Sequence, residues 1–377
     1  MTANPLTIDA LLSQVDTLDA SDLHITAGSA PVVRVRGQLQ RLDQPEQLSP
    51  EATRELLYGI LSSEQQKILE TRRTIDLAYS LPGVARFRVN VFFQRSSLSA
   101  AFRLVPSEIR SLDELGLPVH LAALAAEPRG LVLVTGPTGS GKSTTLATLV
   151  DLINRTRYEH IITIEDPIEF LHRHRNCIVN QREVGPDTPS FAEALRASLR
   201  QDPDIILVGE MRDVETIATA LTAAETGHLV LATLHTQSAP QTIDRIIDVF
   251  PAGQQAQVRT QLAGTLHGII TQNLLPTADG RSRVPALEIL FPDDAVRNLI
   301  RQGKVEQIYS VIQTGTSRGM QTMEQALADL VLRNVVTREA ALARSSRREQ
   351  LAGLLERGVG LAGGRATGVS GLRLAEA

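Results

Sequence analysis

Cysteine and aromatic residues are scarce in this sequence, and their scarcity narrows what the protein can be. Cys177 is the single cysteine, tryptophan is absent, and aromatic residues make up 3% of the 377 residues. One cysteine excludes an intramolecular disulfide and disfavours a cysteine-based zinc site, so a reducing compartment fits the composition. The shortage of aromatic side chains also disfavours a motor that stacks nucleic-acid bases on them.

A strong charge bias and a long apolar run are missing as well. The net charge is −4 and the isoelectric point is about 6.1, which indicates no broad surface for a polyanion. No apolar run approaches the roughly 20 residues that span a bilayer. Residues 1–9 have neither the basic patch nor the apolar segment of a signal peptide. We therefore expect a soluble protein without direct membrane insertion, large enough for two domains.

What the sequence does contain is a phosphate-binding loop in residues 130–143. The apolar run Leu131–Val134 leads into a glycine-rich turn that ends in Gly141-Lys142-Ser143 and continues as a helix-prone segment. This is the P-loop pattern in its required context of strand, loop and helix. Glycines let successive N–H groups face a phosphate, lysine supplies a mobile positive charge, and serine offers a hydroxyl to Mg²⁺. The sequence therefore predicts a site for ATP and Mg²⁺. Its expected contacts are Gly136, Pro137, Thr138, Gly139, Ser140, Gly141, Lys142, Ser143 and Thr144.

Residues 1–105 have the pattern of a small α+β domain. Helical spacing occurs over Leu6–Val15 and Pro50–Leu69, with Ser49 as a candidate N-cap. Alternating apolar and polar residues predict strands within Ser21–Ile25, Pro31–Leu42 (with a turn at Gly37), Ile75–Leu81, Ala85–Arg95 and Leu98–Val105. Residues 106–128 carry the prolines of a linker with one short helix in it.

From residue 129 onward, strands alternate with helices, which predicts a mostly parallel sheet with helices on both faces. The expected strands are Leu131–Thr135, Ile161–Ile164, Ile178–Asn180, Asp204–Gly209 and Leu229–Leu234. The expected helices are Lys142–Asn154, Ser190–Arg200, Val214–Thr226 and Gln241–Val249.

Beyond Pro251 the chain is expected to be largely helical. The expected helices there are Gln254–Leu275, Ala295–Gln302, Lys304–Gln313 and Gln321–Leu332, with a strand at Ala286–Phe291. This domain would cover residues 129–343. Residues 344–377, which contain seven glycines and scattered arginines, are expected to form a frayed helix followed by a disordered tail.

Two of the expected parallel strands end in acids. Glu210 follows the apolar run Ile205–Val208 and Gly209, and Glu165 follows Ile161–Ile164. Open α/β sheets bind ligands at the carboxyl ends of their strands, so both side chains are candidates for the Mg²⁺ and the attacking water. One would orient or deprotonate that water and the other would hold metal-bound water. The alternative is structural, with either acid capping a helix or pairing with an arginine.

A histidine and a row of arginines are further candidates. His235 ends the run Leu229–Leu234 at the same expected sheet edge as Glu210, where it could sense a γ-phosphate or hold an arginine. In Arg86–Val91 the arginines alternate with apolar residues, so they share one face of a strand. Taken alone, that face would be read as solvated surface.

Four motifs in sequence order resemble a known family. They are Gly136-Pro-Thr-Gly-Ser-Gly-Lys-Ser143, Thr163-Ile-Glu-Asp-Pro-Ile-Glu169, Leu207-Val-Gly-Glu-Met-Arg-Asp213 and Gly227-His-Leu-Val-Leu-Ala-Thr-Leu-His-Thr236. They are similar to the Walker A, Asp-box, Walker B and His-box of the secretion ATPase superfamily, which powers type II secretion and type IV pili.

Other segments resemble one branch of this superfamily, the PilT-type retraction ATPases of twitching motility. These segments are Ser21-Asp-Leu-His24, Arg86-Phe-Arg-Val-Asn90, Ala295-Val-Arg-Asn-Leu-Ile-Arg301 and Ile312-Gln-Thr-Gly315. The resemblance covers roughly residues 5–345. One departure is Gln302, which stands where the retraction signature usually ends in an acid.

The resemblance implies a PAS-like α+β N-terminal domain, a RecA-like P-loop ATPase domain with a helical C-terminal segment, and assembly as a homohexamer. It implies that Arg88 and Arg103 reach the γ-phosphate bound by a neighbouring subunit. Lys142, Glu165, Glu210 and His235 would act in the same site, and Mg²⁺ would contact Ser143 directly and Glu210 through water. Implied partners are an inner-membrane pilus platform protein and a paralogous retraction ATPase, with the ring peripheral at the cytoplasmic face of that membrane.

The sequence is also compatible with other functions. Pilus-assembly and type II secretion ATPases typically carry a four-cysteine zinc insertion and a long extra N-terminal domain, neither of which we expect here. A RecA-like nucleic-acid motor would need basic or aromatic loops. A non-hydrolysing ring component would not need Lys142, Glu165 and Glu210 together.

Overall fold

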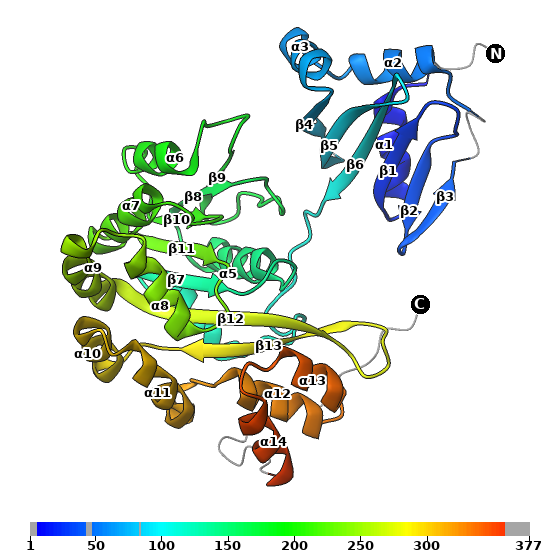
Figure 1. The fold of residues 1–377 in the computed structure, drawn as a ribbon. Coiled ribbons are helices and arrows are strands. Elements are labelled where there is room, and N and C mark those ends of the chain that lie inside the picture. Colours follow the sequence, from blue (N-terminus) through cyan, green and yellow to red (C-terminus); the bar gives the residue numbers. More distant parts are fainter. Residues whose placement is uncertain (1–5, 43–46, 83, 359–377) are drawn as a thin grey trace. The chain divides into compact units, whose positions relative to one another are not determined.

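The computed structural model describes residues 6–42, 47–82 and 84–358, and the chain forms two compact units (Figure 1). The N-terminal unit consists of Met1–Ile109 and Pro167–Arg173, and the C-terminal unit of Arg110–Asp166 and His174–Ala377. None of the described helices is long and apolar enough to cross a membrane.

The N-terminal unit is built on an antiparallel sheet with the strand order β3-β2-β1-β6-β5-β4. Its strands are β1 (Ala20–Thr26), β2 (Val32–Val35), β3 (Gln38–Arg41), β4 (Thr74–Leu81), β5 (Ala85–Gln94) and β6 (Ser97–Val105). Its helices are α1 (Ile8–Thr17), α2 (Pro50–Tyr58) and α3 (Ser63–Arg72). The Ser49 side chain caps α2 by accepting from Ala52 N–H, as the sequence predicts. Alternate side chains of the strands, such as Phe87 and Phe102, fill a buried core.

The C-terminal unit contains a seven-stranded sheet with the order β13-β12-β7-β11-β10-β8-β9, parallel except for β13. Its strands are β7 (Gly130–Thr135), β8 (His160–Glu165), β9 (Ile178–Glu183), β10 (Ile205–Val208), β11 (Leu229–Leu234), β12 (Leu266–Pro276) and β13 (Arg283–Leu290). The central strands β7, β10 and β11 are buried along their whole length. The α+β domain followed by a mostly parallel α/β domain is therefore confirmed.

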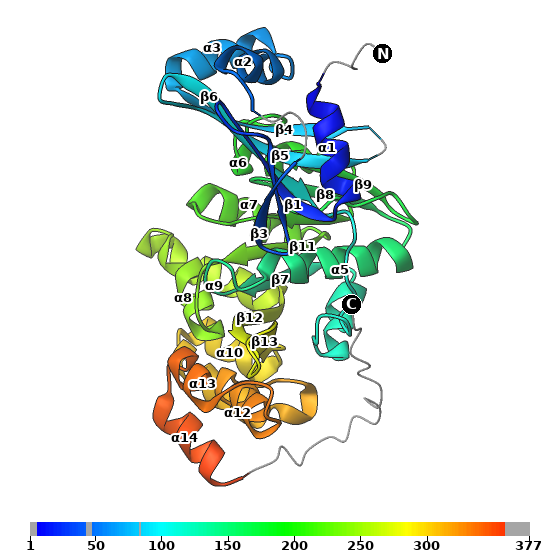
Figure 2. The same cartoon turned by 90° about the vertical axis from the view of Figure 1, so that its right-hand side faces the viewer.

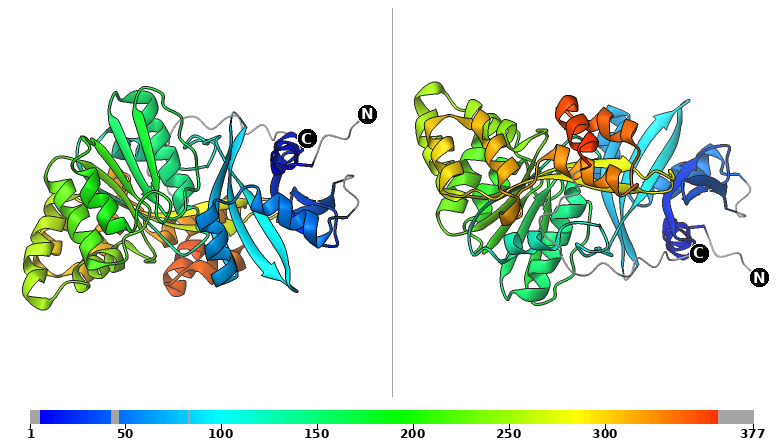
Figure 3. Two further views of the ribbon diagram at one scale, coloured as in Figure 1. Left: turned by 90° about the horizontal axis from the view of Figure 1, so that it is seen from above. Right: turned by 90° about the horizontal axis from the view of Figure 1, so that it is seen from below.

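Helices cover both faces of this sheet, as Figures 2 and 3 show. One apolar cluster includes α6 (Phe191–Ser198), α7 (Val214–Glu225), α8 (Ala239–Asp248), α9 (Ala252–Thr265), α10 (Asp294–Gln302) and α11 (Ile308–Thr314). Another includes α4 (Ala122–Ala126) and α5 (Lys142–Thr156). Helices α12 (Met323–Leu332), α13 (Arg338–Arg344) and α14 (Arg348–Glu356) form a further cluster with the distal ends of β12 and β13. Short 3₁₀ turns occur at Val119–Leu121, Val305–Gln307 and Thr316–Arg318.

The prediction of one helix over Gln254–Leu275 is wrong in its second half. Helix α9 ends at Thr265, and the chain continues directly as strand β12. Most residues of β12 between Leu266 and Leu275 are buried, because this strand lies between β7 and β13 with helices on its faces. A strand buried on both faces shows no alternation and reads like a buried helix.

Two other segments are more ordered than their composition indicates. Within the expected linker, Leu112, Leu117 and Leu124 are buried in the cluster around α5. In the expected tail, α14 packs its fully buried Leu351 into the cluster around α12, because apolar residues recur there at helical spacing. The rest of that tail, residues 359–377, lies outside the described residues.

Candidate nucleotide-binding site

The P-loop connects β7 to α5 and is shaped by three glycines with positive φ. Gly136, Gly139 and Gly141 have φ of 136°, 78° and 89°, in the region that favours glycine. At Gly136 a Cβ would also lie 2.3 Å from the carbonyl oxygen of Gln272, so no larger residue fits. The loop thus needs glycine for its conformation and for the close approach of strand β12.

Lys142 and Ser140 show that the loop is suited to an anion. Lys142 is 9% exposed and its Nζ donates to the carbonyl oxygens of Gly136 (3.0 Å) and Pro137 (3.2 Å), which holds the ammonium over the loop. The Ser140 hydroxyl oxygen is buried and has no hydrogen-bond partner among the described residues. The loop leads directly into α5, whose N-terminal amides favour negative charge. These features fit the phosphates of a nucleotide.

Gln272 of β12 contacts this loop and was not recognised from the sequence. It follows directly on the pair Thr271↔Thr135, at the level where β7 leaves the sheet and becomes the P-loop. Its buried Oε1 accepts a hydrogen bond of 2.7 Å from the Thr145 hydroxyl, in the first turn of α5. Its backbone oxygen and side-chain amide lie against Gly136 and Gly141. Gln272 therefore packs against the P-loop and holds the first turn of α5 through Thr145.

The carboxyl ends of β7, β11, β10 and β8 are adjacent, so the residues that follow them share one edge of the sheet. Glu165 ends β8, and its Oε1 accepts hydrogen bonds from the Thr163 hydroxyl (2.7 Å) and the Gln181 amide (3.0 Å). These donors orient the carboxylate. Glu165 therefore keeps its position at the edge where a ligand would bind.

Glu210 lies at the same edge, after β10, and contacts both Arg212 and His235. The Arg212 guanidinium makes two contacts with the carboxylate, at 2.5 and 2.6 Å, and His235 Nε2 lies 3.0 Å from Oε1. Burial raises the pKa of Glu210, but the hydrogen bonds and positive charges of Arg212 and His235 outweigh it and leave the pKa below its ordinary value. Glu210 is therefore ionised at neutral pH. The structure thus contains the arginine pairing considered from the sequence, together with the predicted proximity of His235 and Glu210.

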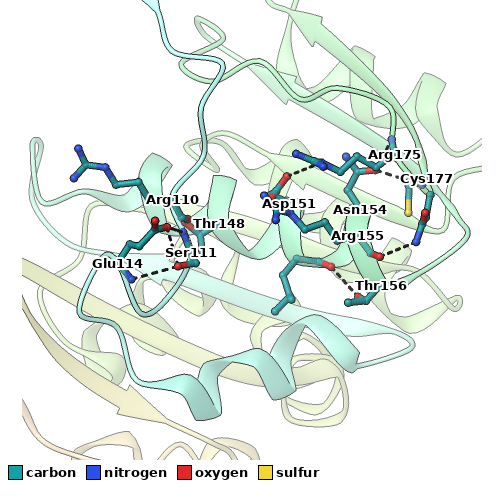
Figure 4. A network of polar contacts seen from close by, with 12 residues as sticks. Arg110, Ser111, Glu114, Thr148, Asp151, Asn154, Arg155, Thr156, Arg175 and Cys177 are labelled. Atoms are coloured by element: carbon teal, nitrogen blue, oxygen red, sulfur yellow. Dashed lines mark hydrogen bonds and ion pairs between the residues drawn. The ribbon is translucent and has the colours of Figure 1, made fainter. Parts of the chain in front are cut away.

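Hydrogen bonds and ion pairs hold helix α5, which carries Lys142, against the segments around it (Figure 4). The Thr148 hydroxyl donates to the Arg110 carbonyl oxygen, and Asp151 forms ion pairs with Arg155 and Arg175. Cys177 belongs to this network: its thiol donates to the Arg157 carbonyl oxygen, and burial raises its pKa. The described residues contain no cluster of histidine, cysteine and acidic side chains suited to a metal ion.

The N-terminal unit holds the two candidate arginines on neighbouring strands. Arg88 of β5 is the register partner of Arg103 of β6, so the two side chains share one face of that sheet. Arg103 is 72% exposed, and its Nε donates to Asp22 at 2.9 Å. Burial raises the pKa of Asp22, but hydrogen bonds from Ser21 and Arg103 outweigh it and leave the pKa low. The Arg88 side chain is exposed, with no hydrogen bond or ion pair to another described residue.

The sequence and the fold are both similar to those of known proteins. The profile of the family described as "Type II/IV secretion system protein" matches residues 3–369. The type IV pilus retraction ATPase PilT of Pseudomonas aeruginosa is 53% identical over 85% of this chain and 93% of that protein. A twitching motility protein of Neisseria gonorrhoeae is 49% identical over 90% of this chain and 92% of its own length. A crystal structure of the pilus retraction motor PilT with bound ADP superposes with a TM-score of 0.85 at 50% identity, covering 92% of this chain and 99% of the other.

Replacing Gln272 tests its support of the P-loop. In Gln272→Leu the Thr145 hydroxyl loses its buried acceptor, which costs about 1–3 kcal/mol of stability. We expect weaker binding of an ATP analogue, measured by calorimetry, because the first turn of α5 loses a fixed contact. Gln307→Leu, at an exposed position, is the matched control. Unchanged nucleotide affinity in a folded Gln272→Leu protein would contradict the assignment.

Proposed function

The chain belongs to the type II/IV secretion system protein family as a PilT-like ATPase of pilus retraction in twitching motility, and we propose that it works as a homohexamer whose ATP sites are completed between subunits. The observation that carries the function is the identity to PilT, which extends over 85% of the chain and includes both units. The P-loop, Glu165, Glu210 and His235, gathered at one sheet edge, supply the chemistry that such an ATPase needs.

We assign nucleotide binding to residues 136–144. The loop amides and Lys142 would hold the β- and γ-phosphates of ATP, with the lysine released from the carbonyl oxygens of Gly136 and Pro137. Mg²⁺ would be held by the Ser143 hydroxyl and, through water, by Glu210, and it would neutralise phosphate charge. Both groups are hard oxygen donors of the kind that Mg²⁺ prefers.

Glu165 and Glu210 then contact different water molecules. The Thr163 hydroxyl and the Gln181 amide orient Glu165, which suits a group that orients or accepts a proton from the attacking water. The contacts with Arg212 and His235 keep the pKa of Glu210 low and the group ionised, which suits a group that holds metal-bound water. His235 then lies where it senses a change at Glu210.

Arg88 and Arg103 complete the site in the proposed ring. Phosphoryl transfer needs positive charge on the γ-phosphate, and within the C-terminal unit Arg212 is already paired with Glu210. Arg88 is exposed beside Arg103, and Asp22 fixes the direction of the second guanidinium. In the ring these arginines would serve a neighbour's nucleotide. The ring would act at the cytoplasmic face of the inner membrane, through a pilus platform protein and with a paralogous retraction ATPase as a further partner.

The function is tested with Lys142→Ala. Loss of the ammonium should lower ATP turnover by about 100-fold or more, because charge stabilisation at the phosphates is removed. Expressed in a piliated bacterium that lacks its own retraction ATPase, the wild-type chain should restore twitching, and Lys142→Ala should not. A wild-type chain that hydrolyses ATP but never restores twitching would contradict the retraction function.

Glu210→Gln separates binding from hydrolysis. The amide keeps the shape of the carboxylate but loses its charge, so ATP should still bind while turnover falls by about 10²–10⁴-fold. Equilibrium binding and single-turnover hydrolysis measure the two effects separately. If the variant is folded but cannot bind ATP, the side chain is structural.

Mixed rings test the completion of sites between subunits. Arg88→Ala should lower turnover by about 10³-fold or more, while ATP affinity falls much less because Lys142 is intact. A subunit lacking Lys142 still owns an arginine, and a subunit lacking Arg88 still owns a P-loop. Mixing the two inactive variants should therefore restore part of the activity. Size-exclusion chromatography checks that both assemble.

Two outcomes oppose this arrangement. Normal hydrolysis by Arg88→Ala alone would mean that its strand face is merely solvated. Mixed rings that form but stay inactive at every ratio would overturn independent completion of the sites. Titration with wild-type subunits then separates a local defect, rescued in proportion, from concerted firing, which is hardly rescued.

A further inference from the structure

A buried acid, Glu288 of β13, caps two helices that are far apart in the sequence. Glu288 is 2% exposed. Oε1 accepts a hydrogen bond of 2.6 Å from the N–H of Ala239, the first residue of α8, and the carboxylate also accepts from the N–H of Met323, the first residue of α12. Burial of an acid is costly unless its oxygens are paired, and here both helix ends supply the pairing.

The α12 side of this contact continues into the C-terminal helices. Glu324, next to Met323, is 1% exposed and accepts from the hydroxyls of Tyr309 in α11 and Ser345 after α13, each at 3.0 Å. The Arg347 guanidinium lies 3.9 Å from the centre of the Tyr309 ring. Glu324 and the residues it contacts therefore join α11, α12 and the start of α14.

The α8 side leads to the nucleotide site. Ala239 comes four residues after His235, and His235 Nε2 lies 3.0 Å from Glu210. Between them, Thr236 bonds to Thr242 through their hydroxyls at 2.7 Å, and Ser238 caps α8. The short segment 235–239 is therefore held at one end by Glu210 and at the other by Glu288. If Glu210 changes partner during hydrolysis, the displacement of His235 has a direct path to Glu288.

We propose that Glu288 is a positioning residue that couples the histidine segment 235–239 at the hydrolysis site to the C-terminal helices α11–α14. This inference rests on the proposed function, because it assumes that Glu210 and His235 take part in hydrolysis. An apolar side chain could fill the same space, but it could not bind two helix N-termini at once. A carboxylate can, since its two oxygens accept from several donors.

The contact depends on ionisation. Burial and the nearby Glu324 raise the pKa of Glu288, the Ala239 and Met323 amides and Arg347 lower it, and the net result is a pKa of about 7. Above this pH both oxygens accept; below it one oxygen carries a proton and competes with the amides. The coupling should therefore weaken as the pH falls through about 7.

The test uses the full-length wild-type protein and Glu288→Gln. Glutamine has one acceptor oxygen, so its NH₂ group faces one of the two amide donors. We expect kcat for ATP to fall by about 10-fold, as for the loss of one hydrogen bond to a charged group, with nucleotide affinity within about twofold of wild type. The fall of wild-type kcat below pH 7 should be absent in the variant. Glu349→Gln, at an exposed position in α14, is the control and should behave as wild type.

Glu324→Gln provides an independent arm. Removing this neighbouring negative charge should shift the fall of kcat to lower pH, because Glu324 raises the pKa of Glu288. A merely structural role for Glu288 predicts lower thermal stability but no displacement of the pH profile measured well below the melting temperature.

Amide exchange in the wild-type protein covers the case in which Glu288→Gln does not fold. After correction for intrinsic rates, protection of the first turns of α8 and α12 should fall together as the pH is lowered from 8 to 6. A folded Glu288→Gln with wild-type kcat and pH profile, or exchange in the two turns that stays independent of pH, would overturn the inference. Absence of ATP hydrolysis in the wild-type protein would instead count against the proposed function.

Discussion

The site depends on how closely strand β12 approaches the P-loop. A loop that offers its amides to a phosphate cannot also pair them within the sheet, so it needs support from a neighbouring element. Here β12 supplies that support: the Gln272 backbone leaves room only for glycine at position 136, and the Gln272 side chain holds Thr145. The same strand pairs with β13, which carries Glu288. One hairpin therefore shapes the nucleotide site and links it to the C-terminal helices.

We propose that one chain alone leaves the site incomplete, because of how charge is distributed at the sheet edge. The edge carries Glu165 and Glu210, and Arg212, two residues after Glu210, forms an ion pair with it at 2.5 Å. An incoming triphosphate adds more negative charge, which Lys142 and the loop amides balance only in part. The exposed arginines of β5 and β6 belong to the other unit. This distribution of charge is the physical reason to propose that hydrolysis requires a neighbouring subunit.

Local signals in the sequence predict the P-loop and the acids and histidine that follow apolar strands, because parallel strands place their carboxyl ends at one edge. The same signals do not predict strand β12 or the contact of Gln272 with the P-loop. A central strand buried on both faces resembles a buried helix, and a single glutamine within it has no pattern. Glu288 left a faint signal, since an acid inside the apolar run Ala286–Leu290 must find buried partners. Those partners, at residues 239 and 323, could be identified only from the tertiary fold.

The buried acids Glu288 and Glu324 contribute to the coupling between helices more than to the stability of the fold. Apolar residues such as Leu327, Leu330 and Leu351 already bind the C-terminal helices to one another and to the end of the sheet. Replacing buried charged groups by apolar ones often leaves stability unchanged or improves it, so Glu288 and Glu324 are poor candidates for mere cohesion. These acids add specific, directional hydrogen bonds. Each oxygen accepts from a particular donor, and those donors begin or connect particular helices. Apolar contacts allow small sliding movements between helices, whereas these hydrogen bonds are either formed or broken. A motor needs such two-state contacts to pass a change at Glu210 to a distant surface.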